Sequence, residues 1–142
     1  RLSAQKNLAE VKERTASDRN NPKVFQFAIL REQSRVHVGN TSIVLSEHES
    51  SRAELGIFIF SPFWGLGFGA SAVKATLRYG FDCLRLRRIE CGTFNPRAKK
   101  MFENLGFVSE GVRYQGMQCG SEALDEFLFG LLRPDYENLC RW

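Results

Sequence analysis

The sequence is poor in the residues that build metal centres and disulfide frameworks. It has two histidines and four cysteines among 142 residues, and no two cysteines have the CxxC spacing of a zinc or redox motif. We therefore predict neither a metal site nor a set of disulfide bonds. The cysteines are interpreted as reduced thiols of a cytoplasmic protein.

Long apolar runs are also absent. No stretch approaches the roughly 20 apolar residues that span a membrane, and no signal-peptide pattern opens the chain. The formal net charge of +4 suits either a nucleic acid or a polyanionic small molecule. Because the sequence has no arginine-rich run and no RNA-binding aromatic motif, we predict neither a nucleic-acid partner nor a membrane partner.

What is present indicates a single domain over residues 1–142. Hydrophobic residues make up 43% of the chain and charged residues 25%, which is typical of a soluble globular protein. A chain of this length can bury roughly two-thirds of its unfolded surface in one core. The twelve phenylalanines predict that this core is rich in large rings.

The hydrophobic pattern predicts a mixed α/β (α+β) domain with the element order β-β-β-α-β-α-β-β. Three strands joined by short polar connections form an antiparallel meander at residues 24–30, 36–45 and 53–60. The elements after the first helix are a strand at residues 87–93, a helix at 95–105, a strand at 107–114, a loop at 115–122 and a strand at 124–132. Residues 1–18 show only weak helical spacing, and residues 19–23 are predicted to turn.

A glycine-rich loop joins the third predicted strand to the first predicted helix. Gly65, Gly67 and Gly69 remove side chains at this junction, so that backbone N–H groups can point at a phosphate beside a helix N-terminus. The loop lacks the lysine and the serine or threonine of a P-loop. It matches the dinucleotide fingerprint, but residues 61–64 separate its first glycine from the strand, which argues against a nicotinamide enzyme.

Several motifs occur in one order and together resemble a known family. They are AELGI at residues 53–57, WGLGFGASA at 64–72, NPRAKKMFENLGF at 95–107, EG at 110–111 and the late Asp125. The set resembles the GNAT N-acetyltransferases over residues 36–132, specifically the branch that contains the Rim-type ribosomal-protein acetyltransferases. The resemblance implies a mixed, mostly antiparallel sheet that is splayed at its centre and flanked by helices. It also implies acetyl-CoA as co-substrate.

The resemblance implies where acetyl-CoA binds. In the family, loop amides hold the pyrophosphate, the strand before the loop pairs with the pantetheine arm, and the second helix starts beside the cofactor. The residues at these places are Ile57, Phe58, Ile59, Leu66, Gly67, Phe68, Gly69, Ala70, Asn95, Arg97 and Lys100. Asn95 has the alternative role of a helix cap, and Arg97 and Lys100 that of a solvated helix face.

The resemblance also implies a catalytic residue, because the Rim-type enzymes place a catalytic glutamate in the AE[IL]G motif. Glu54 occupies that place and is the candidate general base, the alternative being an ordinary exposed strand residue. Phe102 and Ala98 stand where family members carry a tyrosine or a serine, so the acid that protonates the thiolate is unassigned. Ser109, Tyr114 and a bound water are its candidates.

The leading function is transfer of an acetyl group to a primary amine. The acceptor is a protein α-amino group, a polyamine or an amino sugar, and Asp125 either binds this amine or belongs to the sheet. The alternative is a non-catalytic acyl-CoA-binding module, which the missing tyrosine and serine favour and the retained Glu54 opposes. We expect a monomer or homodimer, and no counterpart of the family's first strand before Val24.

Overall fold

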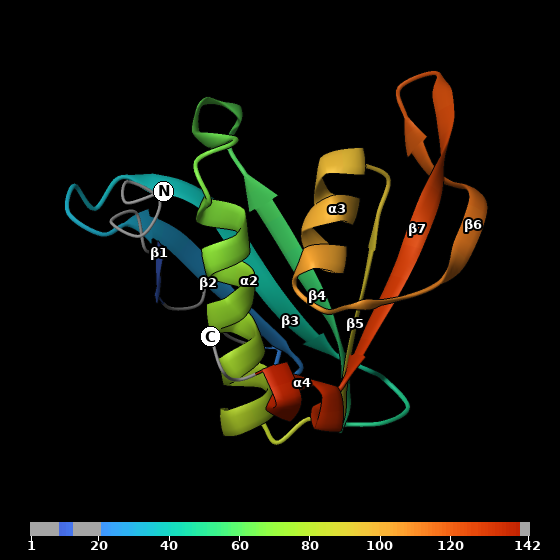
Figure 1. Cartoon of the computed structure of the whole chain (residues 1–142), viewed down its shortest axis with the longest axis horizontal. Helices are drawn as coiled ribbons and strands as arrows, with labels where there is room; N and C mark the ends of the chain where they lie inside the picture. The colour runs from blue at the N-terminus through green and yellow to red at the C-terminus, as the bar shows by residue number, and fades with distance from the viewer. Residues whose placement is uncertain (1–8, 13–20, 140–142) are drawn as a thin grey trace.

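The computed structural model describes residues 9–12 and 21–139, and its strands form one seven-stranded sheet in the order β1-β2-β3-β4-β5-β7-β6 (Figure 1). The strands are β1 Ala9–Lys12, β2 Val24–Arg31, β3 His37–Leu45, β4 Arg52–Ile59, β5 Arg88–Thr93, β6 Val108–Cys119 and β7 Glu122–Leu132. The helices are η1 Ser61–Phe63, α2 Phe68–Arg78, η2 Tyr79–Cys83, α3 Pro96–Asn104 and α4 Arg133–Leu139. No helix in these described ranges is long and apolar enough to cross a membrane.

The pairing of β4 with β5 organises the sheet. It is parallel, whereas every other neighbouring pair of strands is antiparallel. Its register begins at Arg52 opposite Arg88 and ends at Glu54 opposite Glu90. Beyond that point β5 stays paired with β7 as far as Thr93, while β4 stays paired with β3. The expected mixed, mostly antiparallel and centrally splayed sheet is therefore confirmed.

The alternation of side chains along the strands gives the sheet two unlike faces. In β4, Ala53 and Leu55 are buried and Glu54 and Phe58 are exposed. The buried side chains face α2 and α3, which lie in front of the sheet in Figure 1. We call this side the helix face and the opposite side, which no helix in the described ranges covers, the open face.

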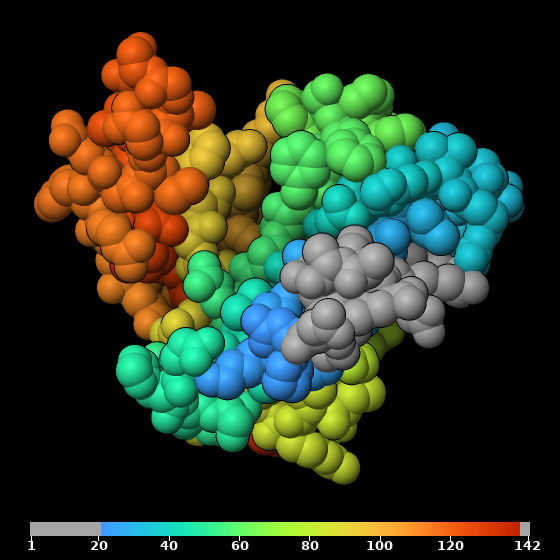
Figure 2. Space-filling model, turned by 180° about the vertical axis from the view of Figure 1, so that it is seen from behind, coloured from blue at the N-terminus to red at the C-terminus, as the bar shows by residue number. Residues whose placement is uncertain are grey.

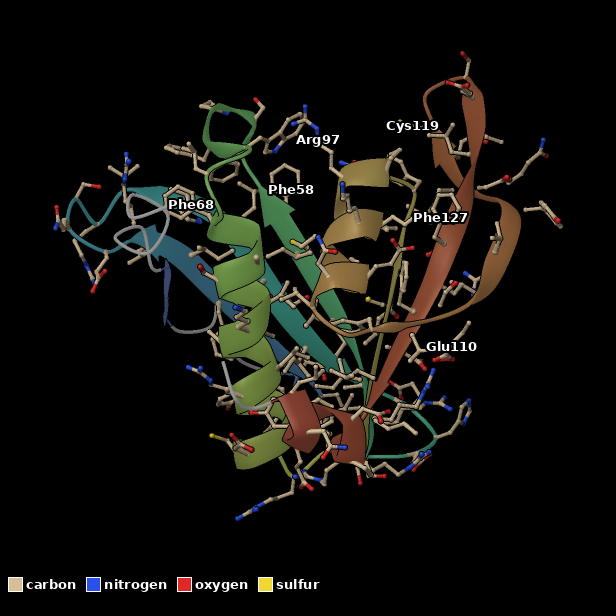
Figure 3. The ribbon with its side chains drawn as sticks, viewed as in Figure 1. Phe58, Phe68, Arg97, Glu110, Cys119 and Phe127 are labelled. Atoms are coloured by element: carbon tan, nitrogen blue, oxygen red, sulfur yellow. The ribbon has the colours of Figure 1, made fainter. Side chains whose placement is uncertain are left out.

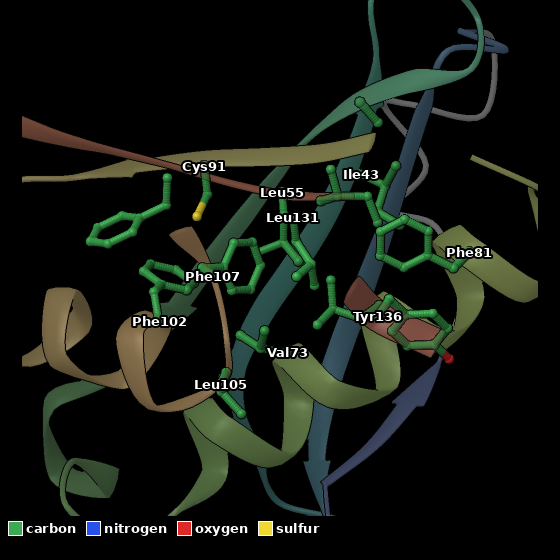
Figure 4. Packing of buried hydrophobic residues seen from close by; sticks show 14 of the residues in the cluster. Ile43, Leu55, Val73, Phe81, Cys91, Phe102, Leu105, Phe107, Leu131 and Tyr136 are labelled. Carbon is green, nitrogen blue, oxygen red and sulfur yellow. The ribbon is translucent and has the colours of Figure 1, made fainter. Parts of the chain in front are cut away.

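Most of the core lies between the helix face and the helices (Figure 4). Phe102 of α3 packs at ring-centroid distances of 5.2 Å from Phe107 and 5.8 Å from Phe129. Phe81, in the π-helical turn that extends α2, stacks at 4.5 Å on Tyr136 of α4. Burial of each such ring stabilises the fold by roughly 1.5–3 kcal/mol, so the expectation of a ring-rich core is confirmed.

Three expectations about secondary structure are corrected. Residues 9–12 form β1, paired antiparallel with β2, rather than a helix, and they supply a strand before Val24; residues 1–8 and 13–18 lie outside the described ranges. The pairing partner, rather than weak local periodicity, determines this strand. The predicted sequence elements also omitted α4, although Pro134 near its start and Asp135 in its first turn are helix-start signals.

The third correction concerns residues 115–122, which do not form a loop. β6 extends to Cys119 and β7 begins at Glu122, so the two strands make one long hairpin. The register shifts between Arg113 and Met117, and Gln115 has a φ of 49°. Part of the glycine-rich sequence that resembles a loop forms this bulge, and the pairing of β6 with β7 resumes beyond it.

Candidate functional site

The glycine loop ends at the start of α2. Gly67 is the N-cap residue with a φ of 87°, and no side chain caps the helix. The first intrahelical bond there runs from the Ser71 N–H to the Gly67 carbonyl, so the amides of the first turn have no intrahelical acceptor. The buried ring of Phe68 anchors this turn in a small core cluster. Open amides and the helix dipole together favour an anion at this position.

Close contact between the two central helices explains the next glycine. A Cβ atom at Gly69 would lie 3.2 Å from the Met101 sulfur of α3. Gly69 therefore lets α3 approach the first turn of α2. Leu66, in the loop itself, is exposed.

A cavity of about 340 Å³ opens between α2 and α3. Its lining consists of Ala70 of α2 and of Arg97, Lys100, Met101, Asn104 and Leu105 from α3 and its end. Figure 3 shows Arg97 at the first turn of α3, next to the glycine loop.

The basic side chains of α3 differ in what they contact. Arg97 and Lys100 are exposed, and within the described ranges neither side chain has a hydrogen-bond or ion-pair partner. Lys99, between them in the helix turn, instead pairs with Glu103 at 3.1 Å and lies 5.2 Å from the Phe127 ring centroid. Arg97 and Lys100 are thus available for an anionic ligand, and Lys99 is already engaged.

Asn95 performs the capping role. Its side-chain oxygen accepts a hydrogen bond of 2.9 Å from the Arg97 N–H, and its own N–H donates to the Thr93 hydroxyl at 3.0 Å. These contacts fix where α3 begins relative to β5.

The main chain of β4 alternates between its two neighbours. The Phe60 N–H donates to the Val38 carbonyl at 2.9 Å, so by alternation the polar groups of Phe58 also point to β3 and those of Ile57 point to the side where β5 diverges. The Ile59 carbonyl accepts a 2.7 Å hydrogen bond from the Trp64 indole. Among the three predicted pantetheine contacts, Ile57 is therefore the residue whose N–H and carbonyl both point into the cleft and have no partner among the described residues.

Glu54 lies where the cleft begins, at the last residue of β4 that pairs with β5. Its side chain is exposed on the open face and makes no hydrogen bond or ion pair with any described residue. Glu90, directly opposite, is bound by the Arg88 guanidinium at 2.8 Å and 3.0 Å. Of two facing carboxylates, one is thus neutralised and the other is free to accept a proton.

The candidate acids are not at the cleft. Ser109 and Tyr114 belong to β6, the edge strand that β7 separates from β5. Phe102 is buried in the core, and it has no hydroxyl. Burial, and secondarily the charge of Glu54, raises the pKa of the Cys91 thiol, which therefore stays protonated and is not a nucleophile.

Asp125 has a structural contact. Its carboxylate accepts a 2.9 Å hydrogen bond from the Gln115 N–H at the hairpin bulge. This bond satisfies a main-chain group that the register shift removes from the ladder. Of the two alternatives for Asp125, the geometry favours a place in the sheet.

Some residues near the cleft were not among the predicted site residues. Met101, Asn104 and Leu105 line the cavity with Arg97, and their spacing from Arg97 is that of one helix face, which was the available signal. Glu126 reaches from β7 over Gly92 of β5, where a Cβ atom would collide with its carboxylate. No sequence pattern predicts that crossing, because it depends on which strands are neighbours.

The chain is similar in sequence to known proteins. Residues 2–108 match the model of the acetyltransferase (GNAT) domain. The uncharacterized N-acetyltransferase p20 of Bacillus licheniformis is 29% identical over 113 residues, covering 78% of this chain and 64% of the relative. For the uncharacterized N-acetyltransferase YoaA of Bacillus subtilis, the identity is 26% over 112 residues, with 78% and 63% covered. The chain thus spans less than two-thirds of the length of these relatives.

Solved structures show the same fold. A spermidine/spermine N-acetyltransferase SpeG from Vibrio cholerae superimposes with a TM-score of 0.80 at 22% identity, covering 88% of this chain and 73% of that one. A putative acetyltransferase gives a TM-score of 0.72 at 28% identity, with 84% and 62% covered. With the matching domain model, the chain belongs to the GNAT acetyltransferase family.

Proposed function

We propose that this chain binds acetyl-CoA in the cleft between β4 and β5 and transfers the acetyl group to a primary amine. The observation that carries the proposal is the position of Glu54 at the point where the two strands separate. An open helix N-terminus lies beside the same cleft, together with Arg97 and Lys100, whose side chains have no partner among the described residues. Enzymes of the GNAT fold use acetyl-CoA as co-substrate.

The residues of the cleft fit such a ligand. Gly67 holds a backbone conformation that side chains disfavour, which leaves the first turn of α2 uncovered. Its amides suit the pyrophosphate, and Arg97 and Lys100 suit the nucleotide phosphates. The main chain of Ile57 suits the amide groups of the pantetheine arm. When bound, acetyl-CoA supplies an activated acetyl thioester.

Glu54 is proposed to act as the general base. An alkylammonium is not nucleophilic until it loses a proton, and a positioned base typically contributes about 10²–10⁴-fold to the rate. Glu54 takes that proton directly or through water, and the neutral nitrogen then forms the amide bond. The carbon–sulfur bond breaks in the same exchange, and the proton that the nitrogen loses on forming the amide passes through water to the departing thiolate.

We further place the chain in the Rim-type branch. The AELGI motif around Glu54 supports this placement, as does similarity to the putative ribosomal N-acetyltransferase YdaF of Bacillus subtilis. That relative is 27% identical over 101 residues, covering 70% of this chain and 55% of the relative. The branch contains enzymes for protein α-amino groups and for other amines, so it does not by itself define the acceptor.

The proposal is tested by thiol release from acetyl-CoA in the presence of primary amines, with Glu54→Gln as the comparison. We expect amine-dependent release by the native chain and a loss of tenfold or more in kcat for the variant. Binding of acetyl-CoA without amine-dependent release would instead support the non-catalytic acyl-CoA-binding alternative.

A further inference from the structure

The open face beside the cleft carries an exposed aromatic surface. Phe58 is 59% exposed, which is unusual for a large ring in the centre of a sheet. It packs edge-to-face against Phe60 at 5.6 Å, and Phe60 packs in the same way against His37 at 5.1 Å. We call these three rings the aromatic patch.

The aromatic patch and Glu54 share one line along β4. Glu54 and Phe58 are four residues apart on the same face, so their Cα atoms lie about 13 Å apart at the usual strand rise. Gly56 lies between them and adds no side chain, because a Cβ atom there would lie 2.6 Å from the Ser42 hydroxyl. The line therefore runs from the Glu54 carboxylate, past the Ser42 hydroxyl that lies over Gly56, to the Phe58 ring.

The surface is hollowed at this position. Viewed from the open face, Figure 2 shows a depression between the β6–β7 hairpin and the end of β4, with α3 visible at its floor. A molecule that approaches Glu54 from the open face therefore meets the cleft between β4 and β5 without crossing a helix of the described ranges.

The charges around the base of the cleft are mostly paired. Arginine neutralises each neighbouring strand carboxylate: the pairs are Glu90 with Arg88 at 2.8 Å, Glu110 with Arg88 at 2.8 Å, and Glu126 with Arg113 at 2.9 Å. Glu54 has no such partner among the described residues. A ligand with one ammonium group matches this surface, whereas a polyamine needs several free carboxylates.

The backbone argues against a peptide on this face. The main-chain groups of β3 and β4 are used in their ladder, and those of Ile57 point into the cleft rather than outward. A peptide main chain would find few hydrogen-bond partners here, while a ring finds other rings at edge-to-face distance.

We propose that the acceptor is a small primary arylalkylamine, with its ring on Phe58 and Phe60 and its single ammonium at Glu54. This inference rests on the proposed acetyl transfer and adds the substrate class. Phe58 is then the residue that determines selectivity for the acceptor.

The test compares three acceptors at saturating acetyl-CoA: 2-phenylethylamine, spermidine and the tripeptide amide Phe-Gly-Gly-NH2. We expect kcat/KM for 2-phenylethylamine to exceed that of each other acceptor by about tenfold or more. A preference for spermidine or for the peptide would overturn the inference while leaving acetyl transfer established. Acetyl-CoA binding with no turnover of any amine would overturn the proposed function and the inference with it.

Two variants of Phe58 and one control test whether this residue causes the preference for 2-phenylethylamine. Phe58→Ala is expected to raise KM for 2-phenylethylamine about tenfold with little change in KM for acetyl-CoA, and Phe58→Leu to lie between. Val108→Ala removes an apolar side chain of similar exposure from the edge strand β6 and is expected to leave both constants unchanged. Calorimetric titration of 2-phenylethylamine into the complex with CoA gives a readout independent of turnover. Equal affinity in the native chain and Phe58→Ala would overturn the role of Phe58.

Discussion

The two faces of β4 present different chemical groups. On the helix face, Ala53 and Leu55 are buried against α2 and the core, and the cleft beyond them offers main-chain groups. On the open face, Glu54 presents a carboxylate without a partner among the described residues, and Phe58 presents an exposed ring. In the proposed function, one strand thus contributes to a cofactor site made of backbone groups and to an acceptor site made of side chains.

This difference has a consequence for specificity. A site built from amides and a helix N-terminus depends on conformation, so its sequence requirement is a few small residues such as Gly67 and Gly69. A site built from side chains changes with each substitution. The cofactor side of β4 is therefore expected to be general to the family, and the open face is expected to be particular to this chain.

The largest expected effect is on CoA affinity, and it comes from placing a side chain over the open amides at the start of α2. Gly67→Val is expected to weaken CoA binding about 100-fold or more, because valine disfavours the φ of 87° and covers the open amides. Calorimetric titration of CoA measures the affinity, and circular dichroism checks the fold.

Gly65→Val is the matched control for that variant. Gly65 also has a positive φ, of 73°, but a Cβ atom there would contact nothing within 4 Å. Valine at position 65 therefore strains the backbone as valine at position 67 does, but it does not cover the amides at the start of α2. Equal loss of affinity in the two variants would attribute the effect to strain and contradict the amide site.

The next largest effect is on kcat and concerns Glu54 on the open face. Glu54→Gln is expected to lower kcat tenfold or more with unchanged KM for acetyl-CoA, because the amide cannot take a proton. Glu90→Gln is the control, since Arg88 already neutralises that carboxylate. A kcat for Glu54→Gln equal to that of the native chain would assign Glu54 a structural role.

A smaller effect is expected from the basic residues of α3. Arg97→Ala and Lys100→Ala are each expected to weaken CoA binding roughly fivefold to tenfold, since a charge-assisted phosphate contact is lost. Lys99→Ala is the control, because Lys99 already pairs with Glu103. The loss should diminish at high salt. If Lys99→Ala lowers the affinity for CoA as much as the other two variants, the loss is a general effect of charge instead.

Phe102→Tyr tests whether a hydroxyl at position 102 can protonate the thiolate. The ring of Phe102 is 2% exposed and packs against Phe107 and Phe129, so an added hydroxyl loses water without a partner in that cluster. We expect a destabilisation of about 1–3 kcal/mol and a melting point lower by several degrees. A higher kcat in this variant would show instead that the hydroxyl reaches the thiolate.

The smallest effect is a pH dependence of stability. The hydrogen bonds from Arg88 hold the pKa of Glu110 below its ordinary value, and Glu110 reaches Arg88 across Gly130, where a Cβ atom would collide with it. Figure 3 shows Glu110 near the base of the sheet. A depressed folded pKa stabilises the fold above the unfolded pKa of about 4.3, and this stabilisation is lost as pH falls further.

Glu110→Gln removes that dependence. The melting point of the native chain is expected to exceed that of the variant at pH 7, and the difference is expected to shrink toward pH 3. Glu122→Gln, at an exposed glutamate of the hairpin with no resolved partner among the described residues, serves as the control. A difference that stays constant with pH would contradict the ion pair as its cause.

The sequence predicts the parts of this structure that local patterns determine. The alternation around Glu54, the glycine loop and the start of α3 at Asn95 are all readable from spacing. β1 is not, because its pairing with β2 rather than its own periodicity decides it, and the long β6–β7 hairpin is not, because a register shift between Arg113 and Met117 makes its sequence resemble a loop. The aromatic patch also cannot be predicted from the sequence, since the exposure of Phe58 depends on what covers the open face.

The central claim is that the cleft between β4 and β5 binds acetyl-CoA, and a thermal melt tests it most directly. A ligand at about 100 times its Kd stabilises the folded state by roughly 2.7 kcal/mol, which raises the melting point by several degrees in a domain of this size. We predict this shift with acetyl-CoA, its loss in Gly67→Val, and no shift with NADH. Equal melting points with and without acetyl-CoA, or an equal shift with NADH, would contradict the account.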